Sequence, residues 1–315
     1  MKRRPLLEGL RTFLPGWRYR TGTGGSGSAS YCYSVWLRHL CMAYQNGLYP
    51  NPPVIAELGP GDSLGIGLAA LISGCEKYYA LDLVKHAAPE KNLAIFDELV
   101  NLFKRKAPIP GNEELPHVEP KLDDYRFPAD LLDEARMREA LAPERLMRIR
   151  SSIMNLGQDN PVIQYKVPWY SCSAPERGSV DMIFSQAVLE HVDNLETSYQ
   201  AMNAWLKPSG YFSHTIDFRC HETAAEWNGH WAYSDFTWRL IRGRRPYLLN
   251  REPHSTHIHM MAEAGFAIVC DKRIYAPAHL RRSQLARKFR NISDEDLVTC
   301  VAFIQGGKTR SGPVA

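Results

Sequence analysis

Short apolar runs alternate with segments of helical periodicity in the central part of the chain. The runs at 54–58 (VIAEL) and 77–82 (KYYALD) are rich in apolar and aromatic residues, which is typical of buried strands. Residues 64–73, between them, predict a helix that follows a tight loop. A strand, a helix and a strand within about 30 residues predict a βαβ unit, which is the building block of a parallel sheet.

The same rhythm returns farther along the chain. A helix is predicted at 194–206, and further strands are predicted at 161–167, 179–185, 210–216, 265–273 and 296–306. Residues 84–160 interrupt the rhythm with several prolines and dense charge at helical spacing, so we predict a mostly helical insertion there. Strands that alternate with helices predict an open α/β sheet covered on both faces.

The chain ends add smaller parts to this domain, which we place at 51–306. Residues 1–50 predict an N-terminal helical cap with a flexible Gly/Ser-rich loop at 21–30, and 307–315 form a tail. Residues 5–14 are basic and amphipathic, which leaves peripheral contact with a membrane open. No internal repeat is visible, and the oligomeric state is not predicted.

Composition narrows the class of protein. The 315 residues are 44% hydrophobic and 23% charged, which is ordinary for a globular protein, and the net charge of +4 is too small to indicate a nucleic-acid partner. Glu8 and Arg11 interrupt the N-terminal apolar segment, so we expect neither a signal peptide nor a transmembrane segment. The seven cysteines are scattered without a C-x-x-C pair, which favours reduced thiols in a cytoplasmic protein.

A glycine-rich loop follows the first predicted strand. In an open parallel sheet, ligands bind beyond the carboxyl ends of the strands. The loop ELGPGDSLG has G-x-G-x-x-x-G spacing, with Leu64 where a dinucleotide fingerprint has its third glycine. Glu57 and Asp62 add negative charge, which disfavours a pyrophosphate and favours a cationic nucleoside. Asp82, which ends the second strand, is placed to accept hydrogen bonds from ribose hydroxyls.

Four segments in this order resemble the motifs of class I S-adenosylmethionine-dependent methyltransferases of the type 11 kind. They are ELGPGDSLG, YYALD, VDMIFSQAVLEHV and WLKPSGYFSHTID, which lie within residues 54–216. The resemblance implies a Rossmann-like, seven-stranded, mostly parallel sheet with the last strand antiparallel. It also implies S-adenosyl-L-methionine as the cofactor.

The resemblance further implies a set of cofactor-binding residues. The loop glycines would surround the methionine portion, the second-strand acid would bind the ribose, and the residue after it would lie against the adenine. This set is Glu57, Gly59, Gly61, Asp62, Ser63, Asp82, Leu83, Ser185, Gln186 and His191. The family's acid or amide after the third strand is replaced by Val167-Pro168-Trp169, so adenine recognition is left to backbone groups or to stacking on Trp169.

Histidines, aromatics and cations concentrate after the fifth predicted strand. Six of the eleven histidines lie between residues 214 and 259, and we interpret 217–260 as a substrate wall. The substrate-binding candidates are Trp227, His230, Trp231, Tyr233, Arg251 and His254. Transfer of a methyl group to an alcohol needs a base, so we assign His214 or His221 to that role, with Asp217 orienting the imidazole.

A metal is the rival use of this segment. The spacing H-x-x-D-x-x-x-H, with Glu222 and Glu226 nearby, matches no diagnostic site, so we assign no metal. The preferred function is methylation of a hydroxyl on a small molecule or glycan, such as a sugar or surface polysaccharide, with anionic acceptors included. The alternatives are N- or C-methylation of another metabolite, a nicotinamide-dependent dehydrogenase, and a non-catalytic scaffold.

Overall fold

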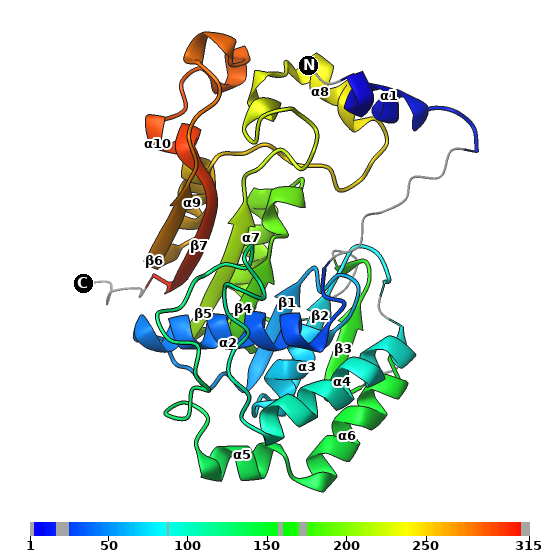
Figure 1. Cartoon of the computed structure of the whole chain (residues 1–315), viewed down its shortest axis with the longest axis vertical. Coiled ribbons are helices and arrows are strands. Elements are labelled where there is room, and N and C mark those ends of the chain that lie inside the picture. The colour runs from blue at the N-terminus through cyan, green and yellow to red at the C-terminus, as the bar shows by residue number, and fades with distance from the viewer. Residues whose placement is uncertain (1–2, 17–24, 87, 157–159, 170–174, 310–315) are drawn as a thin grey trace.

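A twisted seven-stranded sheet runs through the centre of the protein (Figure 1). The computed structural model describes residues 3–16, 25–86, 88–156, 160–169 and 175–309. The strands are β1 (Val54–Leu58), β2 (Lys77–Leu81), β3 (Ile163–Lys166), β4 (Val180–Gln186), β5 (Leu206–Asp217), β6 (Phe266–Tyr275) and β7 (Thr299–Lys308). Their order is β3-β2-β1-β4-β5-β7-β6, and β7 is antiparallel to both of its neighbours. The predicted fold class is therefore confirmed.

Helices cover both faces of the sheet, and each face has its own apolar core. The helices of the first face are α2 (Ala29–Gln45), α3 (Gly65–Ile72), α4 (Pro89–Lys104), α5 (Glu134–Ala140) and α6 (Pro143–Met154). Those of the second face are α7 (Leu195–Trp205) and α9 (His254–Glu263). The central strands β1, β2 and β4 are buried on both sides, as near-continuous apolar runs require in a sheet covered by two helical layers, whereas the edge strands β3 and β6 are partly exposed.

The segment 84–160 is less helical than its charge spacing predicted. The helices α4, α5 and α6 account for part of it, but residues 105–133 contain no helix. Five prolines in that stretch disfavour helix because proline lacks the backbone donor. The stretch is held by the buried guanidinium of Arg38, which donates to the carbonyl oxygens of Pro110, Val118 and Pro120 at 2.7–3.0 Å.

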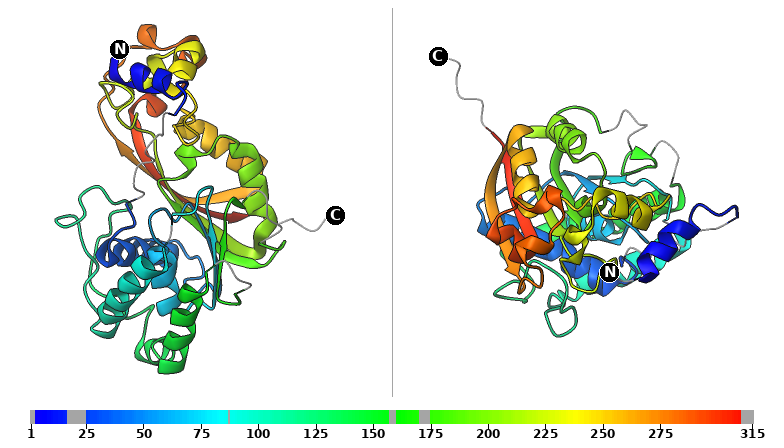
Figure 2. Two further views of the ribbon diagram at one scale, coloured as in Figure 1. Left: turned by 90° about the vertical axis from the view of Figure 1, so that its right-hand side faces the viewer. Right: turned by 90° about the horizontal axis from the view of Figure 1, so that it is seen from above.

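A second layer of structure, which we call the lid, lies over the carboxyl ends of the parallel strands (Figure 2). The lid consists of residues 218–253 and 276–298 together with α1 (Arg3–Arg11); it includes η3 (Gly229–Ala232), α8 (Asp235–Arg242), η4 (Arg282–Gln284), η5 (Arg287–Phe289) and α10 (Asp294–Val298). Two small apolar clusters of its own stabilise it.

The two helices of the predicted N-terminal cap lie in different places. Helix α2 packs on the sheet, whereas α1 packs on α8 in the lid. Gly9 makes the second contact so close that a Cβ there would lie 2.0 Å from the carbonyl oxygen of Leu240. The predicted 1–50 cap is therefore divided between the lid and the sheet.

Parts of the predicted loop and tail lie outside the described residues, namely 21–24 and 310–315, as does Cys172. The other six cysteines are free. Within the described ranges, no helix combines the length and the apolarity that crossing a membrane requires.

Candidate active site

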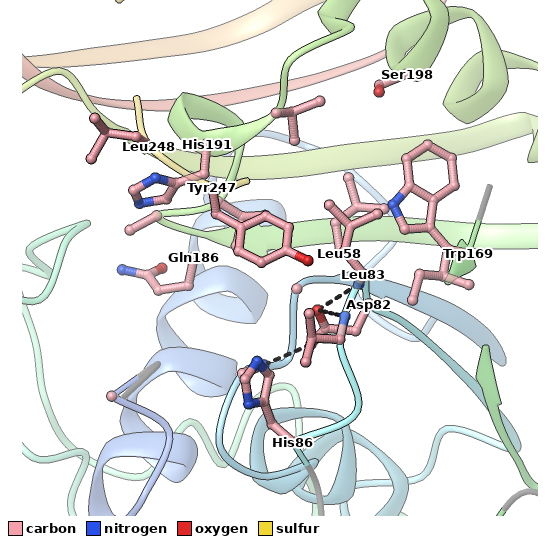
Figure 3. A pocket seen from close by; sticks show the side chains of 18 of the residues that line it. Leu58, Asp82, Leu83, His86, Trp169, Gln186, His191, Ser198, Tyr247 and Leu248 are labelled. Carbon is pink, nitrogen blue, oxygen red and sulfur yellow. Dashed lines mark hydrogen bonds between the residues drawn. The ribbon is translucent and has the colours of Figure 1, made fainter. Parts of the chain in front are cut away.

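A cavity of about 620 Å³ lies beyond the carboxyl ends of β1, β2 and β4, under the lid (Figure 3). Its position is the one predicted for a ligand site in an open parallel sheet. Of the predicted residues, seven line it: Gly59, Gly61, Asp82, Leu83, Gln186, His191 and His221. The cavity is therefore built by the loop after β1, the end of β2, the segment after β4 and the lid.

The glycine-rich loop forms the floor of the cavity. Gly59 and Gly61 have φ values of 61° and 74°, in the left-handed region that favours glycine. A Cβ at Gly59 would lie 2.8 Å from the methyl carbons of Val188, so only glycine fits there. The N-terminal side of the loop is fastened by Ser26, whose hydroxyl donates to the carbonyl oxygen of Pro60 at 2.8 Å. The loop thus presents bare backbone to a ligand, as a close-fitting nucleoside requires.

Asp82 lies at the edge of this floor and its carboxylate is oriented by backbone groups. Oδ1 accepts from the N–H of Leu83 at 2.7 Å, and Oδ2 accepts from the N–H of Gly61 at 3.4 Å. Burial raises the pKa of Asp82, while these hydrogen bonds act in the opposite direction. Each oxygen has further acceptor capacity toward the cavity, which suits two ribose hydroxyls.

An apolar slot adjoins Asp82. Leu83 and Trp169 line it together with Met202 and Trp205, which come from α7. The rings of Trp169 and Trp205 meet edge to face with centroids 5.7 Å apart. Trp169 therefore lies where stacking on an adenine would need it, which is one of the two alternatives from the sequence. The two α7 residues carry no motif, so the sequence did not reveal them.

Gln186 faces the cavity and is oriented by a buried polar network. Its Oε1 lies 3.1 Å from Nε2 of His39, and its Nε2 donates to the carbonyl oxygen of Glu119 at 3.2 Å. Nδ1 of His39 lies 2.6 Å from the hydroxyl of Ser213. Burial lowers the pKa of His39 to about 4, so the imidazole is neutral and pairs with Gln186 as a hydrogen-bonding group.

One acid and two histidines, Asp217, His191 and His221, meet on the lid side of the cavity. Nε2 of His221 lies 3.3 Å from Oδ2 of Asp217, and the ring centroids of His191 and His221 are 5.1 Å apart. Burial raises the pKa of Asp217, but hydrogen bonds and charge from His221 and Arg219 outweigh it and hold this pKa below its ordinary value. Asp217 is therefore a carboxylate that orients the imidazole of His221.

His214, the other candidate base, is in the wrong place for that role. It is fully buried within β5, where Nδ1 lies 2.8 Å from the hydroxyl of Ser185 and the ring stacks on Phe212. Burial lowers its pKa to about 3. Neither His214 nor Ser185 lines the cavity. His214 is therefore not placed to act as the base on a ligand in the cavity, and Ser185 does not contact that space.

Three residues predicted to bind the cofactor lie behind the floor of the cavity: Glu57 in β1, and Asp62 and Ser63 in the loop. Glu57 is buried and accepts a hydrogen bond from the hydroxyl of Tyr78. Ser63 is buried and exchanges hydrogen bonds with Ser26, and Asp62 lies 4.0 Å from Lys91. None of the three side chains lines the cavity, so their role is to hold the floor from behind.

The predicted substrate wall is the interior of the lid. Trp231 is fully buried, and Arg251 pairs with Asp235 at 2.7 Å while it lies over the ring of Trp238. None of the six substrate-binding candidates lines the cavity; these are Trp227, His230, Trp231, Tyr233, Arg251 and His254.

The lid contacts the cavity through other residues of the predicted wall 217–260. Arg245, Tyr247 and Leu248 line it, and the Tyr247 ring projects toward Asp82 in Figure 3. His86, in the loop after β2, lines the opposite side. Arg245, Tyr247 and Leu248 belong to the predicted wall 217–260, and this membership was the one signal in the sequence that could have found them.

Comparisons with known proteins found similarity to methyltransferases. A family model described as a methyltransferase domain matches residues 156–214. A methyltransferase from Mesorhizobium loti that depends on S-adenosylmethionine is 14% identical, covering 86% of this chain and 98% of its own, with a TM-score of 0.42. Such an enzyme from Methanosarcina mazei is 11% identical, covering 84% and 96%, with a TM-score of 0.44. No curated protein matches this chain.

The strand order of the sheet is a second observation, independent of the family match. A dinucleotide-binding Rossmann sheet has the order 3-2-1-4-5-6, whereas here an antiparallel β7 lies between β5 and β6. The family match and the strand order together support the predictions of a class I methyltransferase, of its enzymatic activity and of S-adenosyl-L-methionine as its cofactor.

Proposed function

We propose that this class I S-adenosylmethionine-dependent methyltransferase transfers the methyl group to a hydroxyl of a small molecule or glycan end, with His221 acting on that hydroxyl. The observation that carries the proposal is the pair formed by His221 and the buried Asp217 in the wall of the cavity. An imidazole oriented by a carboxylate is the usual general base at neutral pH. An alcohol needs such a base, since it is a poor nucleophile while protonated.

The cofactor would lie along the floor. Its ribose hydroxyls would bond to Asp82, its adenine would enter the slot of Leu83 and Trp169, and its methionine portion would follow Gly59 and Gly61. When bound, the cofactor supplies an electrophilic methyl group on a sulfonium. The chain itself aligns the two reactants, which is worth about 7–11 kcal/mol of barrier in well-oriented systems.

The acceptor would occupy the side of the cavity beneath the lid. Tyr247 offers a ring that can stack on a sugar or aryl face, and Gln186 offers a fixed amide. The whole cavity of about 620 Å³ suits small ligands rather than a polymer segment. Six free cysteines in the described ranges suit a reducing compartment, and we propose the cytoplasm.

The test is a product assay with the His221→Ala variant. Turnover on a panel of hydroxylated acceptors and their amine counterparts is followed by S-adenosylhomocysteine release, and mass spectrometry locates the methyl group. We expect O-methylated products and a kcat at least about 100-fold lower in His221→Ala. Affinity for S-adenosylhomocysteine should change less than about twofold.

The matched control is His259→Ala, because His259 is an exposed histidine paired with Glu263 at 3.3 Å, away from the cavity. It should keep full turnover. Methylation of the amine counterparts alone would favour N-methyl transfer, and full activity of His221→Ala would remove the base from the mechanism.

A further inference from the structure

The carboxyl group of Glu190 is buried beside His191, which lines the cavity, and it has no hydrogen-bond partner among the described residues. Glu190 lies in η2 (Leu189–His191), directly after β4, and is 3% exposed. Neither of its carboxylate oxygens makes a hydrogen bond in the described part of the chain. A buried carboxyl group without partners is costly, and native proteins rarely keep one without a reason.

Two histidines converge on this carboxyl group. One candidate ligand atom from each of Glu190, His191 and His221 lies within 4.8 Å of the other two. Ligands of one transition-metal ion, at about 2.0–2.2 Å from it, lie roughly 3–4 Å apart. If side-chain rotations moved these atoms by about an ångström, all three would therefore be within bonding distance of one ion. The three residues come from two separate segments, η2 and the loop after β5, so that the cluster is a product of the fold.

Each histidine is already oriented by a neighbour, which is how metal-binding histidines are usually arranged. Nε2 of His221 lies near the carboxylate of Asp217, which leaves Nδ1 available. The ring of His191 bonds to the backbone of Tyr247, and its Nδ1 has no partner although it is buried. One nitrogen of each ring is thus fixed and the other is free to bind.

We propose that Glu190, His191 and His221 form a binding site for a divalent transition-metal ion. Two imidazole nitrogens and one carboxylate oxygen suit Zn²⁺, Co²⁺, Fe²⁺ or Ni²⁺ better than Mg²⁺ or Ca²⁺, which prefer oxygen ligands alone. The ion would also neutralise the buried charge of Glu190. This assignment replaces the expectation of no metal that the residue spacing alone supported.

The site would leave open coordination positions toward the acceptor. His191 and His221 both line the cavity, so an ion between them would face it. This consequence rests on the proposed function: an acceptor hydroxyl bound to the ion would be acidified by it. With the ion bound, the O-methyl transfer of the proposed function stands, but His221 would hold the ion and would not itself take the proton of the hydroxyl.

Metal binding can be measured on the full chain without any acceptor. Protein stripped with a chelator is titrated with Co²⁺, followed by visible absorption, and with Zn²⁺, followed by calorimetry. We expect one equivalent of either ion to bind. Glu190→Gln and His221→Ala should each weaken the affinity at least about tenfold. His259→Ala, the exposed control, should leave it unchanged.

Binding of S-adenosylhomocysteine to each variant serves as the test of folding. Because His221 is more exposed than Glu190, its variant keeps the experiment decisive if Glu190→Gln fails to fold. The site is refuted if no stoichiometric binding occurs, or if His221→Ala binds the ions as the native chain does. An N-methylated product from a metal-binding enzyme would overturn the proposed function and leave the metal site standing.

Discussion

At the scale of single residues, the floor of the cavity depends on a buried acid that never reaches the ligand. Glu57 lies behind the glycine-rich loop and is bonded to Tyr78. Burial raises the pKa of Glu57 to about 8, although the Tyr78 hydrogen bond acts against this shift. The loop is therefore supported by a carboxyl group that is protonated at neutral pH.

This pKa makes stability fall as the pH rises. In the unfolded chain Glu57 loses its proton near its ordinary pKa of 4.5, whereas in the folded protein it keeps the proton up to about pH 8. Its stabilising contribution is complete below pH 4.5 and is lost as the pH rises to about 8. Between about pH 6 and about pH 8.5, ionisation of Glu57 should lower the free energy of unfolding of the native protein by about 2 kcal/mol. The Glu57→Gln variant should lack this decrease.

Denaturant unfolding of both proteins at the two pH values measures this difference. Asp62→Asn serves as the matched control, because Asp62 belongs to the same loop but is not buried. It should leave the pH dependence of the native protein unchanged. Equal pH slopes for the native protein and Glu57→Gln would show that the buried carboxyl group is ionised throughout.

The site residues that sequence could predict are those of local motifs. Gly59, Gly61 and Asp82 line the cavity because a loop at the end of β1 and an acid at the end of β2 must face it. His214 was misplaced because side chains inside a strand face the layers that cover the sheet, whereas His221, beyond the strand, is free to turn toward the ligand.

At the scale of elements, the packing of α1 on α8 depends on close contact at one glycine. Gly9 lies against the carbonyl oxygens of Leu240 and Ile241, and Arg245 lies 3.8 Å from Glu8. The last contact matters because Arg245 also lines the cavity. Helix α1 therefore supports the part of the lid that meets the ligand.

We expect Gly9→Ala to release α1 from α8, at a cost of about 1–3 kcal/mol to their packing. The direction of the effect is informative, because in an isolated helix the same substitution would stabilise the helix by about 1 kcal/mol. Hydrogen exchange of residues 3–11 should become faster, while exchange in the sheet stays unchanged. The control is Leu7→Ala, because Leu7 is 51% exposed. Slower exchange in Gly9→Ala would contradict the packing.

The elements themselves were largely predictable, with instructive exceptions. The bounds of β1 match its apolar run, because a strand buried on both faces needs apolar residues throughout. Residues 105–133 were misjudged because their charge spacing resembles that of a helix, whereas distant side chains such as Arg38 and Gln186 hold the stretch through its carbonyl oxygens. Such long-range contacts leave no local pattern.

At the scale of the whole molecule, the cavity has two walls of different origin. The sheet supplies the floor, and the lid supplies Tyr247 and Leu248. The lid's aromatic and cationic content was interpreted as a binding surface, but buried lid interiors use the same residues for packing. Composition therefore located the segment that meets the ligand without separating its surface from its core.

We expect S-adenosylhomocysteine to protect both walls together. Hydrogen exchange should slow at residues 59–61, 186–191 and 245–248, and remain unchanged at 136–145, which lie on the opposite end of the sheet. The melting temperature should rise, since a ligand at 100 times its Kd adds about 2.7 kcal/mol. NADH at the same concentration should do neither. Protection confined to the floor would place the lid outside the cofactor site.

The position of β7 has a consequence for how the protein matures on the ribosome. Strand β6 pairs only with β7 within the described residues, and β7 is the last strand in chain order. While the nascent chain is still being extended, β5 has an open edge and β6 has no partner, so both expose backbone groups that can pair with other chains. Once residues 299–308 have been synthesised, β7 can pair with both strands. Chaperones would therefore protect the chain from aggregation most just before β7 is made.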